Sequence, residues 1–109
     1  GGVYKGTQVI PADWVSESMT AYSQDVYGGD ILEHMTNISY GYMWWTAEAG
    51  AHEVWMARGS CGQLIAIVPD LDMVVVTSAG IINIFDPDAW PRNRAILEMV
   101  GKFIKAQPQ

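Results

Sequence analysis

Hydrophobic positions recur with a helical period near the N-terminus of the chain. Trp14, Val15 and Met19 fall on one helical face, and Pro11 stands just before them, where proline suits the first turn of a helix. This pattern predicts a short helix of about two or three turns. From 20 to 39 no period holds, and glycine, asparagine and scattered polar residues predict a long irregular loop.

The helical period returns after Pro91. Apolar residues then recur at three- and four-residue steps, namely Ala95, Ile96, Met99, Val100, Phe103 and Ile104. Lys102 and Lys105 stand in the last turns, where cations interact favourably with the helix dipole. The pattern predicts a C-terminal helix that begins at Pro91 and ends near Lys105, with one apolar face on the core.

Between the two helices the pattern changes to runs of aromatic and β-branched residues that are typical of strands. The runs at 40–46 and 53–57 predict one hairpin, and those at 63–68 and 73–78 predict a second. The second hairpin is apolar almost without interruption, which predicts burial on both faces. We therefore expect an α+β fold, an antiparallel sheet of three to four strands with a C-terminal helix packed on it, in a single domain over 1–109.

Composition and charge narrow the classes of partner. Half of the residues are apolar and 17% are charged, which excludes a disordered chain. The chain has twelve acidic and six basic residues, and four of the six basic residues lie near the C-terminus. We therefore expect neither nucleic acid nor an anionic membrane surface as a partner. No apolar run reaches the length of a membrane span, which predicts a soluble chain. The single cysteine excludes an intrachain disulfide and leaves the compartment open.

The side chains that carry chemistry are few. Cys61 with His34 or His52 is one candidate thiolate pair, and the alternative is a small buried thiol in a glycine-rich turn with solvated loop histidines elsewhere. The histidines and nearby acids lack the spacing of a metal site, so we expect no metal and no cofactor. Paired acids next to the turns are interpreted as turn formers, namely Asp70 with Asp72 and Asp86 with Asp88.

Arg58 is the only cation between Lys5 and Arg92, and it enters the turn Gly59-Ser60-Cys61-Gly62. Main-chain amides beside glycine approach a ligand closely, so this turn is a candidate site for an anion or a developing oxyanion. The alternative is that Arg58 pairs with one of the many acidic side chains. A set of aromatic residues is interpreted either as core or as the lining of a cleft, namely Tyr40, Tyr42, Trp44, Trp45 and Trp55.

Four blocks in order carry a resemblance to a known family. They are Gly-Gly-x-Tyr-x-Gly-x-x-Val-Ile-Pro-x-x-Trp-Val at 1–15, Tyr-Gly-Tyr-x-Trp-Trp at 40–45, Ala-Arg-Gly-Ser-Cys-Gly-Gln at 57–63 and Ile-Val-Pro-Asp-Leu-Asp-Met-Val-Val-Val at 67–76. Together they resemble the C-terminal third of the β-lactamase-related serine hydrolases. That family includes class C-type β-lactamases, DD-peptidase-like penicillin-binding proteins, esterases and 6-aminohexanoate-dimer hydrolases. The resemblance implies the C-terminal part of a β-lactamase/transpeptidase-like fold.

The family transfers acyl groups through the serine of a Ser-x-x-Lys box, helped by a Tyr-x-Asn box. This sequence contains neither box, so the resemblance implies a C-terminal portion of a larger serine hydrolase, inactive alone. The third box, Lys or His followed by Thr or Ser and Gly, corresponds to 57–59 or one step later. Lys and His are absent there, which argues against classical β-lactam hydrolysis.

By the same resemblance, the backbone amide of Ser60 is the expected oxyanion-hole donor. Gly59 and Cys61 shape the approach of the substrate, and Arg58 at the cleft or its rim holds a substrate carboxylate. The implied partners are the missing N-terminal part of the fold or a second copy in a homodimer, with a small acyl substrate in the complete enzyme. The compartment would be bacterial periplasm or cytoplasm. The alternative function is a stand-alone, noncatalytic binding or assembly module that retains half of the hydrolase fold.

Overall fold

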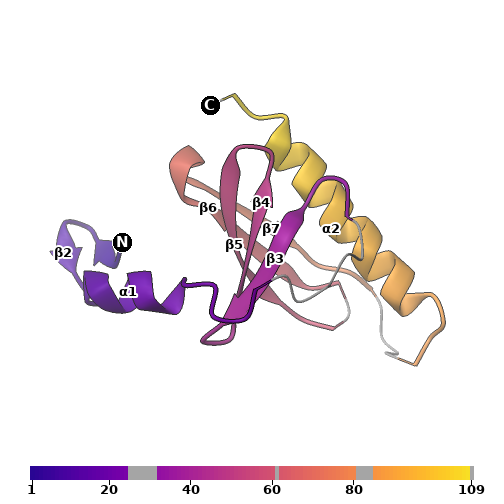
Figure 1. The fold of residues 1–109 in the computed structure, drawn as a ribbon, viewed down its shortest axis with the longest axis horizontal. Helices are drawn as coiled ribbons and strands as arrows, with labels where there is room; N and C mark the ends of the chain where they lie inside the picture. The colour runs from indigo at the N-terminus through magenta and orange to yellow at the C-terminus, as the bar shows by residue number, and fades with distance from the viewer. Residues whose placement is uncertain (25–31, 61, 81–84, 109) are drawn as a thin grey trace.

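The computed structural model describes residues 1–24, 32–60, 62–80 and 85–108, and it has an α+β fold. Its centre is an antiparallel sheet with the strand order β3-β4-β5-β6-β7 (Figure 1). The strands are β3 (Thr36–Gly41), β4 (Trp44–Ala49), β5 (His52–Arg58), β6 (Leu64–Val68) and β7 (Met73–Thr77). The expected antiparallel sheet with a C-terminal helix is therefore confirmed, but the sheet has five strands instead of three or four.

Two smaller elements precede the sheet. A ribbon of β1 (Val3–Tyr4) and β2 (Thr7–Gln8) leads into α1 (Ala12–Ser18), and this N-terminal part extends away from the sheet in Figure 1. The short helix predicted after Pro11 is confirmed, and Pro11 itself is the N-cap residue. The short ribbon was not predicted, because two-residue strands leave no measurable period in the sequence.

The prediction of one strand at 40–46 and a loop up to 39 is wrong. β3 begins inside the predicted loop, and the chain turns back at Tyr42 and Met43, whose φ angles are 49° and 67°. Two successive residues with positive φ match the twist of a tight hairpin, although asparagine and glycine are the usual residues there. The turn was not predicted, because the aromatic residues on both sides of it give 40–46 the pattern of one continuous strand.

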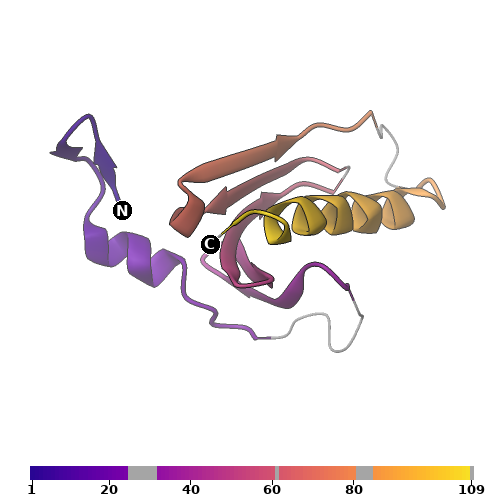
Figure 2. The same ribbon diagram turned by 90° about the horizontal axis from the view of Figure 1, so that it is seen from above.

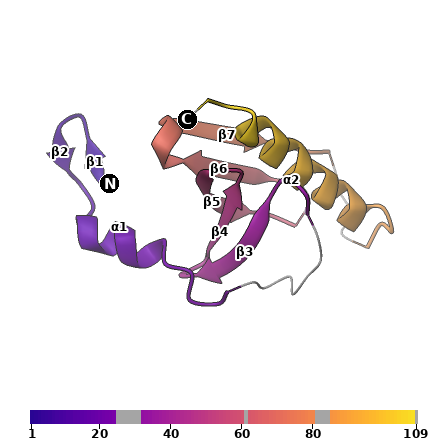
Figure 3. The same ribbon diagram turned by 45° about the horizontal axis from the view of Figure 1, so that its top comes forward.

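Helix α2 (Ala89–Lys105) covers one face of the sheet. Seen from above in Figure 2, the sheet curves around this helix, and Figure 3 shows β3 and β7 at the two rims. Because side chains alternate between the faces of a strand, every second residue of β4, β5 and β6 points toward α2. The buried residues of this core are Leu32, Met35, Ile38, Ala47, Ala49, Val54, Met56, Leu64, Ala66, Val68, Leu97, Val100 and Ile104.

The opposite face of the sheet is exposed at β6 and β7, so the prediction that the second hairpin is buried on both faces is wrong. Ile65, Val74 and Val76 lie on this face with exposed fractions of 44%, 61% and 65%. No helix in the described part of the chain lies over them (Figure 2). The apolar runs of β6 and β7 therefore supply two faces, of which this chain buries only one.

The predicted C-terminal helix is confirmed and begins slightly earlier than Pro91, at Ala89. The predicted apolar stripe is correct only in part, because Met99 and Phe103 are 59% and 50% exposed. The helix is rotated so that Gly101 is buried, and a Cβ atom at Gly101 would overlap the carbonyl group of His34. Close backbone contact at glycine thus decides which stripe of α2 faces the sheet.

A carboxylate in the same part of the helix holds this rotation. Glu98 accepts hydrogen bonds from the backbone N–H groups of Glu33 and His34, with donor–acceptor distances of 2.5 Å and 2.9 Å. Both donors belong to the segment that leads into β3. The carboxylate therefore joins the end of the sheet to the middle of α2 through charge-assisted hydrogen bonds.

We predict that Gly101→Ala destabilises the protein by about 1–3 kcal/mol, because the added methyl group forces α2 away from His34. The sign of the change in the free energy of unfolding is informative, because alanine in a helix is otherwise favoured over glycine by about 1 kcal/mol. Urea unfolding measures the change. The control is Lys102→Ala, at the exposed neighbouring position, which should leave the free energy of unfolding nearly unchanged. A stabilised Gly101→Ala variant would show that the close contact is absent.

Candidate functional site

The turn between β5 and β6 carries the residues that the sequence singled out, and its main chain is held from several sides. Within the turn, the N–H of Gly59 donates to the carbonyl of Gln63 at 2.8 Å. From α2, Asn93 Nδ2 donates to the carbonyl of Ser60 at 2.6 Å. From β7, the hydroxyl of Thr77 donates to the carbonyl of Gly62 at 3.0 Å. The conformation of this turn thus depends on the neighbouring strand and on the helix.

Gly62 is required at its position in this turn. Its φ angle is 77°, a conformation that favours glycine. A Cβ atom there would also lie 2.7 Å from Ala79 Cβ and 2.7 Å from Ile96 Cδ1. Ser60 is exposed, and Cys61 lies outside the described residues. The structure therefore places three of the four predicted site residues, Arg58, Gly59 and Ser60, at one end of β5.

Arg58 lies against an aromatic ring. Its guanidinium carbon is 4.8 Å from the centre of the Trp45 ring, which is within the range of a cation–π interaction. Trp45 also meets Tyr40 edge-to-face, with 4.6 Å between the ring centroids. A cavity of about 10 Å³ beside Arg58 and Asn93 has room for roughly one water molecule. The Arg58 side chain is thus held by packing on the same side of the sheet as α2.

The aromatic set of the sequence analysis divides between two places. Trp45 contacts the core, whereas Tyr42 is 45% exposed and stacks on Tyr22 with 5.1 Å between the centroids. The Tyr42 hydroxyl donates to Glu17 Oε1 at 3.1 Å, and this hydrogen bond raises the pKa of Tyr42 to about 12. Tyr42 therefore connects α1 to the β3–β4 turn and does not belong to the core.

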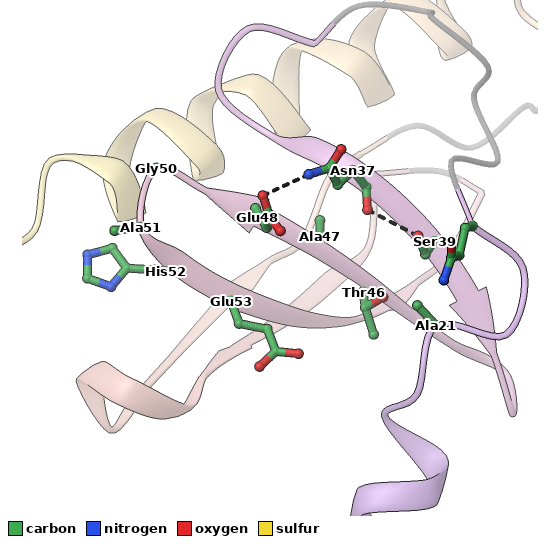
Figure 4. Close-up of a pocket in the computed structure, with 11 residues that line it drawn as sticks. Ala21, Asn37, Ser39, Thr46, Ala47, Glu48, Gly50, Ala51, His52 and Glu53 are labelled. Atoms are coloured by element: carbon green, nitrogen blue, oxygen red, sulfur yellow. Dashed lines mark hydrogen bonds between the residues drawn. The ribbon is translucent and has the colours of Figure 1, made fainter.

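A second hollow lies at the opposite end of β5 and was not predicted. It has a volume of about 650 Å³ (Figure 4). Its lining comes from β3, β4, the start of β5 and the segment before β3, and comprises Ala21, Gln24, Asn37, Ser39, Thr46, Ala47, Glu48, Gly50, Ala51, His52 and Glu53. This lining contains two glutamates and no lysine or arginine. Polar and apolar residues alternate at 37–40, and this alternation could have predicted β3, which forms one wall of the hollow.

Two hydrogen bonds order one wall of this hollow. Asn37 Nδ2 donates to Glu48 Oε2 at 2.8 Å, and the Ser39 hydroxyl donates to the Asn37 carbonyl at 3.2 Å. Figure 4 shows Thr46 and Glu53 projecting to the same side from neighbouring strands. The hollow therefore presents carboxylate, amide and hydroxyl groups, which suit a cationic or hydroxyl-rich ligand.

His52 is not the solvated loop histidine that the sequence suggested. It begins β5, is 2% exposed, and its Nδ1 lies 2.6 Å from Asp70 Oδ2. Its Nε2 lies 3.3 Å from the carbonyl oxygen of Gln107, beyond the end of α2. The hydrogen bond to Asp70 raises the pKa of His52, with a further contribution from Gln107, while burial opposes the rise. An imidazolium satisfies both acceptors, because each ring nitrogen then carries a proton.

The described ranges contain neither a cluster of metal-ligating side chains nor a membrane-spanning helix. Among these residues no three histidine, cysteine or acidic side chains come together in a way that could hold a metal ion. Neither helix described here is long and apolar enough to cross a membrane.

Comparison with known proteins gives no relative: no family model, no curated protein and no solved structure matches this chain.

The His52–Asp70 pair generates a pH prediction. The folded-state pKa of His52 lies above the unfolded value of about 6.5, so the stabilisation is complete below that pH and is lost as the pH rises through the folded-state pKa. We therefore expect Asp70→Asn to reduce the free energy of unfolding more at about pH 5.5 than at about pH 9. Denaturant titration at both pH values measures this difference.

The matched control is Asp72→Asn. Asp72 lies two residues further on with a φ angle of 49°, a conformation that asparagine also adopts readily. It has no hydrogen bond to His52 among the described contacts, so its effect should not change with pH over this interval. Parallel pH dependences of the two variants would contradict the role assigned to the pair.

Proposed function

We propose that this chain is the sheet-and-helix part of a β-lactamase-related serine hydrolase and that its β5–β6 turn contributes a main-chain N–H to the oxyanion hole. The order of the four sequence blocks supports the proposal, as does an antiparallel sheet with a C-terminal helix on one face. The observation that carries it is the anchoring of the turn by Asn93 on one side and Thr77 on the other.

Anchoring matters because an oxyanion hole acts through donors whose positions are set before the reaction. A fixed backbone N–H needs no reorganisation when negative charge develops on the substrate oxygen, and one such donor is worth about 3–4 kcal/mol of transition-state stabilisation. In this proposal the donor is the amide of Ser60. Gly59 and Ser60 are exposed, and Gly59 places no side chain beside the Ser60 amide, whereas the space next to Gly62 is filled by Ala79 and Ile96.

The remaining parts of the reaction lie elsewhere. The sequence contains no Ser-x-x-Lys and no Tyr-x-Asn, so the nucleophile and the general base would come from outside these 109 residues. Arg58, held against Trp45 next to the turn, is proposed to pair with a substrate carboxylate beside Gly59. The role that the resemblance gives to Cys61 falls on a residue outside the described ranges. The substrate class is a small ester or amide.

The second candidate function is a noncatalytic binding module. The hollow of about 650 Å³ favours it, because this hollow is acidic and lies at the other end of β5 from the turn. Its ligand would be a small cation or a hydroxyl-rich compound, held by Glu48, Glu53 and the polar groups of β3 and β4. The two functions predict ligands of opposite charge at two separate places.

We predict that the isolated chain releases no burst of nitrophenol from p-nitrophenyl acetate, because the sequence lacks the Ser-x-x-Lys box that would supply the nucleophile and its base. Stopped-flow absorbance at increasing protein concentration measures the burst. The control is Cys61→Ala, because a thiol is intrinsically the strongest nucleophile among the side chains of this sequence. A burst equal to the protein concentration that survives in Cys61→Ala would refute the assignment of an incomplete site.

The oxyanion donor is tested directly with a tetrahedral anion. On titration with phenylphosphonate, we expect the largest amide chemical-shift change at Ser60 in a nitrogen–proton correlation spectrum. Ser60→Ala should bind as the parent does, because the donor is main-chain, and Ser60→Pro should lose binding because it lacks the N–H.

A titration with a small diamine separates the two functions. Shifts at Thr46 and Glu53 with the diamine, and none at Ser60 with the phosphonate, would favour the binding module over the hydrolase part. A shift at Ser60 with the phosphonate, accompanied by shifts at Gly59 and Gly62 that persist in Ser60→Ala and are lost in Ser60→Pro, would favour the hydrolase part.

A further inference from the structure

The two edges of the sheet differ. At the β3 edge, Ser23 pairs with Tyr40 through two backbone hydrogen bonds of 2.8 Å, so the segment before β3 covers part of this edge. The pairing of β3 with β4 is also irregular between Thr36 and Ser39. Irregular pairing and a covering segment are common ways of protecting an edge from association with another chain.

The β7 edge has none of these protections within the described residues. β7 is the last strand of the sheet order, and its register with β6 is regular from Met73 to Thr77. The strand contains no proline and no charged residue. Along an antiparallel strand, about half of the backbone N–H and C=O groups point away from its one partner. The outer edge of β7 is therefore a straight, uncharged row of hydrogen-bonding groups.

The apolar surface next to this edge continues onto the uncovered face of the sheet. Ile65, Val74 and Val76 are exposed there, and the register places Ile65 opposite Val76 and Ile67 opposite Val74. A contiguous apolar patch on a folded chain is a common mark of an interaction site. The edge and the patch meet at β7. One partner strand would therefore pair with the hydrogen-bonding groups of the edge and also extend the apolar patch.

We propose that this partner is β7 of a second copy, paired antiparallel about a two-fold axis at Val75, so that two sheets join into one. In this register Val74 of each copy lies opposite Val76 of the other. Four valines then form one row across the junction, and the apolar patches of the two copies become continuous. The proposal concerns the chain of 109 residues; in the larger hydrolase proposed above, the resemblance implies that an N-terminal strand pairs with β7 in place of the second copy.

Charge selects the antiparallel arrangement over the parallel one. Asp70 and Asp72 precede β7, whereas the residues that follow it up to Gly80 are uncharged. Antiparallel pairing about Val75 brings the end of β7 at Asp72 near Ser78 of the second copy, while Asp70 lies in the 3-10 turn Pro69–Leu71 that precedes the strand. Parallel pairing would set Asp72 of one copy beside Asp72 of the other, and adjacent like charges on neighbouring strands are destabilising. In a chain of net charge −6, antiparallel pairing joins the two β7 strands without bringing these acidic groups together.

The experiment uses two double variants of the whole chain. Val74→Lys with Val76→Lys places like charges opposite each other at both positions of the proposed dimer, and Val74→Glu with Val76→Glu does the same with negative charge. Both side chains are exposed in the single chain, so neither change removes a core contact. Sedimentation equilibrium should give a dimer for the parent, with a dissociation constant on the order of 10 µM for such a short interface.

Each double variant alone should be a monomer, and their equimolar mixture should recover the dimer, because lysine then faces glutamate across the junction. The control is Ile65→Lys, which adds a charge to the same face one strand away from the edge and should leave the dimer largely intact. Recovery on mixing also shows that both variants are folded.

Four results would overturn the proposal. A parent that is monomeric at about 500 µM would show that the edge takes no second copy. Double variants that still form dimers, or a mixture that fails to recover the dimer, would exclude the Val74–Val76 register. Loss of the dimer in Ile65→Lys as complete as in the double variants would indicate packing of sheet faces instead of strand pairing.

Discussion

The structure depends on the packing of one helix against one face of a five-stranded sheet. The contact is close because Gly101 lets α2 approach the backbone at His34, and Glu98 holds the same segment by two hydrogen bonds. Burial of apolar side chains in this layer is the main favourable term in folding. A single helix covers a single face, so the same arrangement leaves the valines of β7 exposed on the other.

The position of α2 also determines the geometry of the β5–β6 turn. Asn93 near the start of the helix binds the carbonyl of Ser60, while Ile96 and Ala79 leave room only for glycine at 62. At the far end, the chain beyond α2 returns to the sheet at His52, which contacts Asp70 and the carbonyl of Gln107. Helix position, turn conformation and the buried histidine are therefore linked, and movement of α2 would change all of them.

The candidate site was predicted from the sequence only in its location along the chain. Arg58, Gly59 and Ser60 were singled out because an isolated cation enters a glycine-containing turn, and this is a local feature. The contacts of the turn with Asn93 and Thr77 are long-range and could not be read from residue order. The acidic hollow was missed for the same reason, since its walls come from three strands and a preceding segment.

The sequence by itself determined the elements with strong local patterns, namely the C-terminal helix and the strands of the second hairpin, because burial imposes a period on apolar residues. Tertiary structure alone decided where β3 begins, since its pairing with β4 outweighs a weak local pattern, and which stripe of α2 is buried. It also decided that His52 is enclosed and that Val74 and Val76 are exposed. A period shows that a face is apolar, but only the packing of distant segments determines whether that face is covered.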